Sequence, residues 1–470
     1  MMSAWRCRPV AAASDPTERG QSRRRARAVL EEPVAEIVLR SAAGEYQLQI
    51  QDDRLLLHHP LPEVAPIPSG RVEAAIRQAV ERPIAAAPLS QLARNARTAA
   101  VIVDDWARPG VTRHTVAPII LDVLNEGGID DEQITVVMAR GVGLAPPTEA
   151  VNSAFGPALM GRKVRKEINS YHPSRLAFFG YSSRGTPIWI DDAVASADLT
   201  IGIGITFPSP WGGWSGGAKI MVPGAAGAET IRQNHSLMVN VAMGSTDSQG
   251  LLDREEIAAI VGLDLLINLV VNLDGEMVEL AAGEVRQTHQ HIIEAYRHHY
   301  QVELPQKPDI IVTTLDRFQG YPMVSLYPFV DGCLPGAELV AGPGATLIVV
   351  GRCPQGIGAG MAEYMRTTYT MEDLACLKPQ AGTLAFAAIM LAARFARCRE
   401  QYSLVAVVDD LAASECREIG MKKAATLQDA VDQALEAQGG QAKVAILPGL
   451  GNITLPKLAP AAERVTQGES

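Results

Sequence analysis

The chain has 470 residues, a formal net charge of −10 and a hydrophobic content of 47%. This length exceeds that of one typical hydrophobic core, so the chain is predicted to fold into two domains. The acidic balance argues against a nucleic-acid partner, because phosphate contacts require clustered lysines and arginines. No apolar run reaches the ~20 residues that span a bilayer, so no membrane partner is expected.

The start of the chain and the cysteines indicate where the protein resides. Seven arginines precede residue 28, and only Asp15 and Glu18 oppose them. The segment lacks the apolar core of a secretory signal, so residues 1–30 are predicted to be a disordered basic tail. The six cysteines are scattered without a CxxC pair, which is typical of a reducing, cytoplasmic setting.

The first part of the chain has the pattern of a β-α-β series. A strand, a crossover helix and a second strand predict a parallel sheet, and strands buried on both faces are continuously apolar. A glycine-rich loop follows the last of these strands. The expected elements are strands at Ala35–Leu39 and Tyr46–Ile50, a helix at Val72–Val80, a strand at Ala99–Asp104, a helix at Thr115–Asn125, strands at Ile134–Met138 and Leu199–Ile205, and a helix from about Ala228.

A second series of strands and helices follows a linker near Pro305 and Pro308. The sequence therefore predicts two α/β domains with mainly parallel sheets and an interdomain cleft, in which ligands bind beyond the carboxyl ends of the strands. The N-terminal, cofactor-binding domain is predicted over residues 31–290 and the C-terminal domain over residues 300–462. The elements of the second series are strands at Ile310–Thr314, Thr346–Val350, Leu404–Val408 and Val444–Leu447, and helices at about Leu384–Arg399 and Leu427–Ala437.

The most informative segment is the glycine-rich loop that runs from Gly212 to Lys219. Glycines let a backbone approach a phosphate or a flat ring closely, and a desolvated lysine can form a covalent adduct. The alternative is a tight turn with a solvated lysine. Known nucleotide patterns fail here, because Phe207 stands where a dinucleotide-binding pattern needs its third glycine and Lys219 lacks the flanking residues of a P-loop.

Two further motifs contain charged or metal-binding side chains. Asp105 and Arg108 follow a predicted strand, where a carboxylate and a guanidinium can orient a polar substrate or simply form a surface ion pair. His235 lies sixteen residues after Lys219, so the two do not share a helix face but can converge on one ligand. A lone histidine is more often structural than metal-binding.

Together these segments resemble the nickel-dependent lactate racemase family, from about Val101 onward. The family's D-x-T-R-P is present as Asp105-Trp106-Ala107-Arg108-Pro109. Its S-G-G-x-K…P-G-x-x-x-x-E-T-I-x-x-N-H is nearly complete from Ser215 to His235. The resemblance implies a nickel pincer nucleotide, the pyridinium-3-thioamide-5-thiocarboxylic acid mononucleotide, made by cofactor-synthesis proteins that would be partners of this chain.

The resemblance also implies roles for individual residues. Lys219 would hold the cofactor through a thioamide, and His235 would be the protein ligand of nickel, as suits a neutral imidazole. Arg108 and Asp105 would bind a small hydroxy-acid-like substrate. The residues that would line the cofactor are Ser215, Gly216 and Gly217.

The chain departs from the family pattern at both histidines that transfer the hydroxyl proton. Gly143 or Leu144 takes the place of the first and Ser209 that of the second, and none of these is a general base near neutral pH. Phe329 and Gly332 replace a glutamine and a lysine that hold the substrate. The candidate replacement bases are His172 and Asp331.

Three functions are compatible with this pattern. The first is a racemase or epimerase that transfers a hydride at C2 of a hydroxy acid or related substrate other than lactate. The second uses the same cofactor for a different hydride-transfer or redox reaction, because the symmetrical pair of proton-transfer groups is missing. The third is a non-catalytic paralogue that only binds the cofactor.

Overall fold

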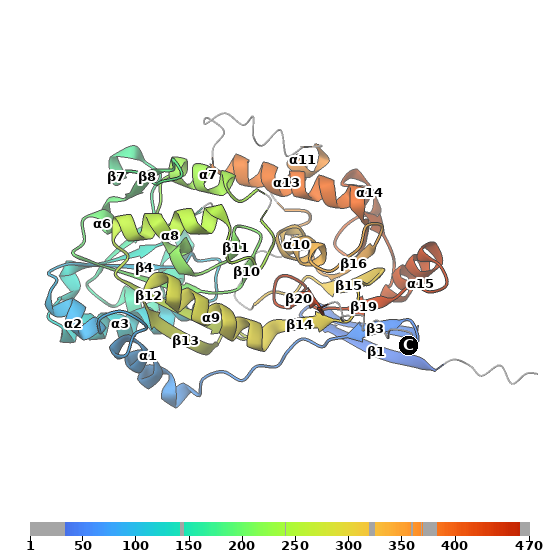
Figure 1. The fold of residues 1–470 in the computed structure, drawn as a ribbon, viewed down its shortest axis with the longest axis horizontal. Helices are drawn as coiled ribbons and strands as arrows, with labels where there is room; N and C mark the ends of the chain where they lie inside the picture. Colours follow the sequence, from blue (N-terminus) through green and yellow to red (C-terminus); the bar gives the residue numbers. More distant parts are fainter. Residues whose placement is uncertain are drawn as a thin grey trace, which may run out of the picture.

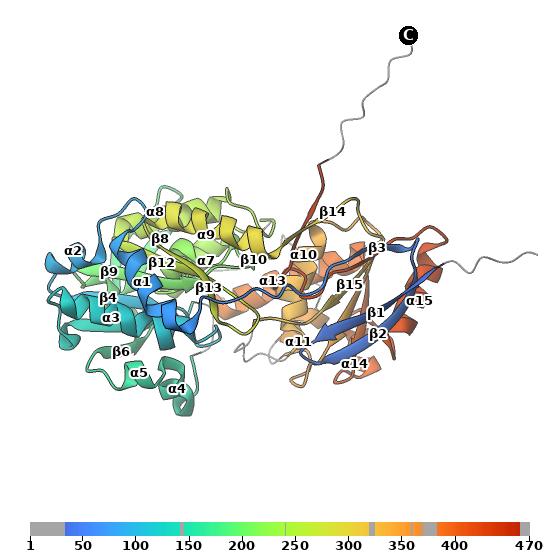
Figure 2. The same ribbon diagram turned by 90° about the horizontal axis from the view of Figure 1, so that it is seen from below.

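The computed structural model describes residues 33–141, 145–239, 241–318, 325–358, 361–367, 369 and 383–460. It contains two α/β units, each built on its own six-stranded, mainly parallel sheet (Figures 1 and 2). The predicted fold class is therefore confirmed. The predicted tail of residues 1–30 lies outside the described residues, as do Gly143 and Leu144. Within the described ranges, no helix combines the length and the hydrophobicity that a membrane span requires.

The N-terminal sheet has the strand order β13-β12-β9-β4-β5-β6, and only the β12–β13 pair is antiparallel. Alternate residues of β4 enter two separate cores, because successive side chains of a strand point to opposite faces. The strands are β4 (Ala99–Val103), β5 (Ile134–Met138), β6 (Arg165–Ile168), β9 (Leu199–Ile205), β12 (Leu265–Val271) and β13 (Met277–Gly283).

Helices cover both faces of this sheet. The core on one face includes residues of α1 (Val72–Glu81), α2 (Leu89–Arg94), α3 (Ala117–Glu126), α4 (Val151–Phe155), α5 (Pro157–Met160) and α9 (Val285–Tyr300). The core on the other includes residues of α6 (Asp192–Ala195), α7 (Ala228–Ser236) and α8 (Gln249–Val261). The short strand pairs β7 (Leu176–Tyr181) with β8 (Pro187–Asp191), and β10 (Pro208–Ser209) with β11 (Gly213–Trp214), complete this unit.

The C-terminal sheet has the order β18-β17-β16-β15-β19-β3, and all of its pairs are parallel. Its strands are β3 (Leu55–His58), β15 (Ile310–Thr314), β16 (Thr346–Gly351), β17 (Ser403–Val408), β18 (Lys422–Lys423) and β19 (Val444–Ile446). Its helices are α10 (Leu334–Glu338), α11 (Met361–Arg366), α13 (Thr383–Gln401), α14 (Ala413–Glu418) and α15 (Leu427–Gln438).

The beginning of the chain belongs to the C-terminal sheet, although the sequence places residues 31–290 in one N-terminal domain. Strand β3 pairs with β19, and the hairpin of β1 (Val34–Ser41) and β2 (Gly44–Gln51) packs its buried residues on the same sheet face as α15. Figure 2 shows the connection that runs from β3 across the molecule to α1. The cause is burial, because the alternating apolar residues of this hairpin find their partners on the second sheet.

Candidate functional site

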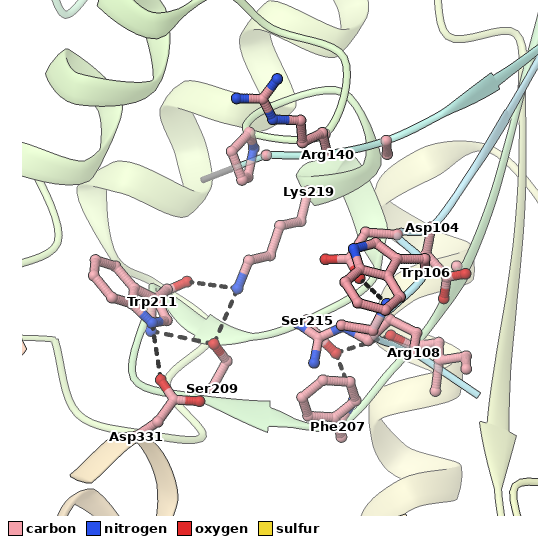
Figure 3. A pocket seen from close by; sticks show the side chains of 18 of the residues that line it. Asp104, Trp106, Arg108, Arg140, Phe207, Ser209, Trp211, Ser215, Lys219 and Asp331 are labelled. Atoms are coloured by element: carbon pink, nitrogen blue, oxygen red, sulfur yellow. Dashed lines mark hydrogen bonds between the residues drawn. The ribbon is translucent and has the colours of Figure 1, made fainter. Parts of the chain in front are cut away.

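A cavity of about 450 Å³ lies beyond the carboxyl ends of β4, β5 and β9, and both units line it (Figure 3). Three loops of the N-terminal unit form most of its wall, and Ser325, Tyr327 and Asp331 of the C-terminal unit face them. The predicted site residues that line it are Asp105, Arg108, Ser215, Gly216, Lys219, His235 and Asp331. Gly217 and His172 lie outside the cavity wall.

Lys219 is held in the cavity as a desolvated amine. It lies in a short turn at Gly217–Ile220, and its Nζ donates to Ser209 Oγ at 2.9 Å and to the Trp211 carbonyl oxygen at 3.5 Å (Figure 3). Burial lowers the pKa of Lys219 well below its usual value, and the charges of Arg254 and Arg108 lower it further. An uncharged amine is the nucleophilic form of lysine, so the site favours covalent chemistry at this nitrogen.

The glycines before Lys219 let the loop fold tightly against the protein. Gly217 has φ of +57°, and a Cβ there would lie 2.3 Å from His289 Nδ1. Its backbone N–H donates to Asn268 Oδ1 at 2.7 Å. Gly216 has φ of +75°, and a Cβ there would meet Thr206 Oγ1 at 2.3 Å. Side chains of the protein thus occupy the space that a Cβ would need at both positions, while Gly216 lines the cavity with its backbone.

Ser215 also fixes the loop. Its Oγ donates to the Ile205 carbonyl oxygen at 2.8 Å and accepts from the Phe207 backbone N–H at 3.0 Å. These bonds tie the loop to the carboxyl end of β9. Ser215 lines the cavity, but its hydroxyl is committed to the backbone, so its contacts serve to hold Lys219 in place.

His235 is buried on α7 and faces the same cavity. Its ring centroid lies 5.1 Å from that of Trp211, whose carbonyl oxygen contacts Lys219. Burial, aided by the positive charge of Arg254, lowers the pKa of His235 to about 3, while the Ile231 carbonyl opposes this shift. Nδ1 is buried and makes no hydrogen bond of ordinary geometry. A neutral imidazole suits a metal ligand.

Arg108 and Asp105 stand on the loop that follows β4. The Arg108 Cζ lies 4.7 Å from the centroid of the Phe207 ring, an arrangement that orients the guanidinium. Asp105 Oδ1 accepts from the Ala107 backbone N–H at 2.5 Å. Both Asp105 and Arg108 line the cavity.

A buried arginine holds this loop in place. Arg113 donates to the carbonyl oxygens of Asp105 at 2.7 Å, Arg108 at 3.0 Å and Ala154 at 2.8 Å. It also pairs with Asp104 Oδ1 at 3.1 Å. Because its donors are spread over the whole loop, Arg113 fixes the backbone from which Asp105 and Arg108 extend.

Neither Asp331 nor His172 is placed to act as a general base inside the cavity. Asp331 Oδ1 accepts from Trp211 Nε1 at 3.0 Å, and Oδ2 accepts from Arg317 NH2 at 2.9 Å, so both oxygens are engaged. His172 is exposed, and its ring pairs with Ser174 at the start of a short turn outside the cavity wall. The sequence could not distinguish these environments, because they depend on tertiary contacts.

The positions that replace the substrate-holding residues are also explained by packing. Phe329 is fully buried in the C-terminal core rather than exposed to the cavity. A Cβ on Gly332 would lie 2.0 Å from Asn452 Oδ1, so no side chain fits at this position. The C-terminal wall therefore lacks a charged group at either position.

Several polar residues of the site were not singled out by the sequence. Arg140 lines the cavity, and its Cζ lies 4.3 Å from the centroid of the Tyr171 ring. His289 Nε2 is 2.8 Å from the Ser215 carbonyl oxygen. Asn268 is the single polar residue of a fully buried strand, β12, and that pattern is a signal that sequence reasoning could have used. Arg254 has no comparable signal in the sequence.

Comparison with known proteins agrees with this architecture. The chain matches the lactate racemase N-terminal domain over residues 42–246 and the lactate racemase C-terminal domain over residues 304–454. It is 26% identical to the lactate racemase of Lactiplantibacillus plantarum over 392 residues, which cover 80% of this chain and 90% of that protein. It is 24% identical to that of Thermoanaerobacterium thermosaccharolyticum over 348 residues, with 72% of this chain and 74% of that protein covered.

Solved structures show the same fold. The lactate racemase apoprotein of Thermoanaerobacterium thermosaccharolyticum matches with a TM-score of 0.78 at 20% identity, covering 90% of this chain and 100% of that one. A Thermotoga maritima protein matches with a TM-score of 0.59 at 16% identity, covering 85% and 100%. The fold therefore defines a class of two-domain α/β proteins. Because the two matched domains span more than half of the sequence, the chain belongs to the lactate racemase family.

Proposed function

We propose that this protein is a nickel pincer nucleotide-dependent racemase or epimerase that transfers a hydride at C2 of a hydroxy acid or related substrate other than lactate. One observation supports this most directly. An amine and an imidazole from separate segments, Lys219 and His235, line one cavity, and burial disfavours the charged form of both. Family membership supplies the racemase class.

The residues of the cavity fit the proposed cofactor. Burial disfavours the charged form of the Lys219 amine, and the uncharged form is the one that can become a thioamide nitrogen. His235 has a buried Nδ1 without a hydrogen bond of ordinary geometry. When bound, the cofactor supplies a nickel-bearing ring that accepts and returns the hydride of the substrate. Arg108, oriented by Phe207, binds the carboxylate of the substrate, and aromatic side chains of the wall exclude water.

The substrate is proposed to differ from lactate because the charges that grip a small carboxylate are reduced. Gly332 has no room for a cationic side chain, and Ser209 uses its hydroxyl to contact Lys219. Tyr327 adds an aromatic surface to the same wall as Asp331. A larger or less charged hydroxy acid fits this wall better than lactate does.

A second candidate is a different hydride-transfer or redox reaction with the same cofactor. The engaged oxygens of Asp331 and the exposed position of His172 favour it, because neither residue returns a proton within the cavity. Incubation with a panel of chiral hydroxy acids and sugar acids in deuterated water separates the candidates. Inversion at C2 supports the racemase or epimerase, whereas a keto product that accumulates when an electron acceptor is added supports the second candidate.

Cofactor loading tests the proposal directly. We expect protein produced together with the cofactor-synthesis enzymes to contain nickel and to show a mass increase on the Lys219 peptide. Lys219→Ala removes both signals, whereas His235→Ala lowers nickel and keeps the adduct. His172→Ala is the matched control and keeps both, because His172 lies outside the cavity wall. Unmodified Lys219, in a host that loads a lactate racemase in parallel, would contradict the proposal.

A further inference from the structure

Arg254 is a buried guanidinium without an acidic partner. It lies on α8 with 1% of its surface exposed. Its Nε donates to the Gly250 carbonyl oxygen at 3.3 Å, and its NH2 donates to the Trp211 carbonyl oxygen at 3.0 Å. Among the ion pairs of the described residues, none involves Arg254, although buried charges are usually paired. Such an unpaired charge requires a structural or functional explanation.

The loop that precedes Lys219 is shaped around this guanidinium. Gly212 has φ of +85°, and a Cβ there would lie 1.9 Å from Arg254 NH2. The next residue back, Trp211, gives its carbonyl oxygen to Arg254 and also to Lys219 Nζ, at 3.5 Å. Two basic nitrogens therefore converge on one oxygen atom.

We propose that Arg254 is a positioning residue that keeps the Lys219 amine uncharged and directed into the cavity. A guanidinium remains protonated at physiological pH, so a second positive charge beside the same carbonyl oxygen is disfavoured. The neighbouring lysine then rests as a free amine, which is the nucleophilic form. The purpose of this arrangement rests on the proposed function, in which Lys219 is the covalent anchor of the cofactor.

The other charged groups around Lys219 do not replace Arg254. Burial is the main cause of the lowered pKa of Lys219, Arg254 is the next, and Arg108 acts in the same direction. Asp331 opposes the shift, but its oxygens are already bonded to Trp211 and Arg317. The nearby imidazoles of His235 and His289 add no positive charge, because burial lowers the pKa of His235 to about 3 and that of His289 to about 4.

The reactivity of Lys219 in the apoprotein tests this role. Trace acetic anhydride acetylates the uncharged amine and releases acetate and a proton, and peptide mass spectrometry measures the rate at each lysine from about pH 6 to about pH 11. Lys422, an exposed residue of β18, is the internal reference. We expect the reaction midpoint of Lys219 to lie well below that of Lys422 in the unmodified chain.

Three substitutions separate charge from packing. Arg254→Met and Arg254→Gln both remove the charge, and glutamine keeps a donor for the Trp211 carbonyl oxygen. We expect both to raise the midpoint of Lys219, and each whole pH step in that rise lowers the rate near neutral pH roughly tenfold. Arg254→Lys keeps the charge and is expected to keep the low midpoint. At high pH the Lys219 amine is deprotonated in every variant, so the acetylation rate there reports only how easily the reagent reaches the amine.

An unchanged midpoint in Arg254→Gln would overturn the proposal, and so would a change confined to the rate at high pH, which indicates a packing role. Circular dichroism confirms folding, and Arg254→Gln decides the outcome if Arg254→Met does not fold. A low Lys219 midpoint in protein that never acquires the cofactor leaves the role of Arg254 intact and contradicts only the proposed function.

Discussion

Burial shifts the pKa values of several residues that line the cavity. Burial favours the uncharged amine of Lys219 and the neutral imidazole of His235, and it raises the pKa of Asp104 to about 6. Asp104 Oδ1 is bonded to Thr112 and Arg113, while Oδ2 is buried without a hydrogen-bond partner. Such perturbed groups collect at functional sites, because the same enclosure that shifts the pKa also excludes water from the chemistry.

Asp104→Asn tests the burial of this carboxyl through the pH dependence of stability. The folded pKa lies above the unfolded one, so the native state binds the proton more tightly and loses stability as pH rises from about 4 to about 7. Asparagine does not titrate. We therefore expect the unfolding free energy of the unmodified chain, relative to the variant, to fall by about 3 kcal/mol at most across this range, as measured by urea unfolding.

Asp198→Asn is the control for this experiment. Backbone hydrogen bonds lower the folded pKa of Asp198, so its relative contribution is expected to rise with pH instead of falling. Parallel pH curves for the unmodified chain and Asp104→Asn would show that Asp104 is not enclosed as the structure describes.

Among the elements, the loop between β9 and α7 depends on its neighbours for its shape. Asn268 of β12 and His289 of α9 contact it from the sheet side, and Asn234 of α7 donates to Asp253 of α8 at 2.8 Å. Lys219 and His235 are thus fixed by elements that are distant in the sequence. The loop can change little without moving both residues.

Gly217→Ala is expected to destabilise the protein by roughly 2–4 kcal/mol, because the new Cβ meets His289 and the backbone remains at positive φ. Gly262→Ala is the matched control. Gly262 has φ of +93° with no atom within 4 Å of a Cβ, so only the backbone cost of about 1 kcal/mol applies. Chemical unfolding measures both, and equal losses would show that the contact with His289 does not constrain the loop.

Across the protein as a whole, the two units are joined by more than one crossing of the chain. Strands β1, β2 and β3 precede the N-terminal unit but pack on the C-terminal sheet. Strand β14 (Gln301–Leu304) then pairs in parallel with β20 (Leu455–Leu458) near the end of the described chain. These crossings hold the two walls of the cavity together.

Leu39→Ala tests the assignment of the N-terminal hairpin to the second unit. Leu39 is 1% exposed, and its removal is expected to cost roughly 2–4 kcal/mol. Val38→Ala, at a site with 41% exposure in the same strand, is expected to cost less than about 0.5 kcal/mol. Hydrogen exchange should increase in β15, β16 and β19 while β4 and β9 keep their protection. An equal increase in both sheets would contradict the assignment.

The order of the amino acids is enough to predict the main elements of each sheet and the central pair of site residues. The sequence predicts the fully buried strands β4, β9 and β15 within a residue of their observed ends, because burial on both faces leaves few polar residues in such segments. Lys219 and His235 were identified through motifs of fixed spacing. Such signals are local, so they survive without knowledge of the fold.

Contacts between distant groups, in contrast, are known from the folded chain alone. In the folded chain β3 pairs with β19, and both oxygens of Asp331 accept hydrogen bonds. His172 lies at the surface, and Arg254 donates to the Trp211 carbonyl oxygen. Each of these outcomes joins segments far apart in the chain, and residue types near one another in sequence do not encode them. Burial and charge at the site are set by these contacts, and so is its chemistry.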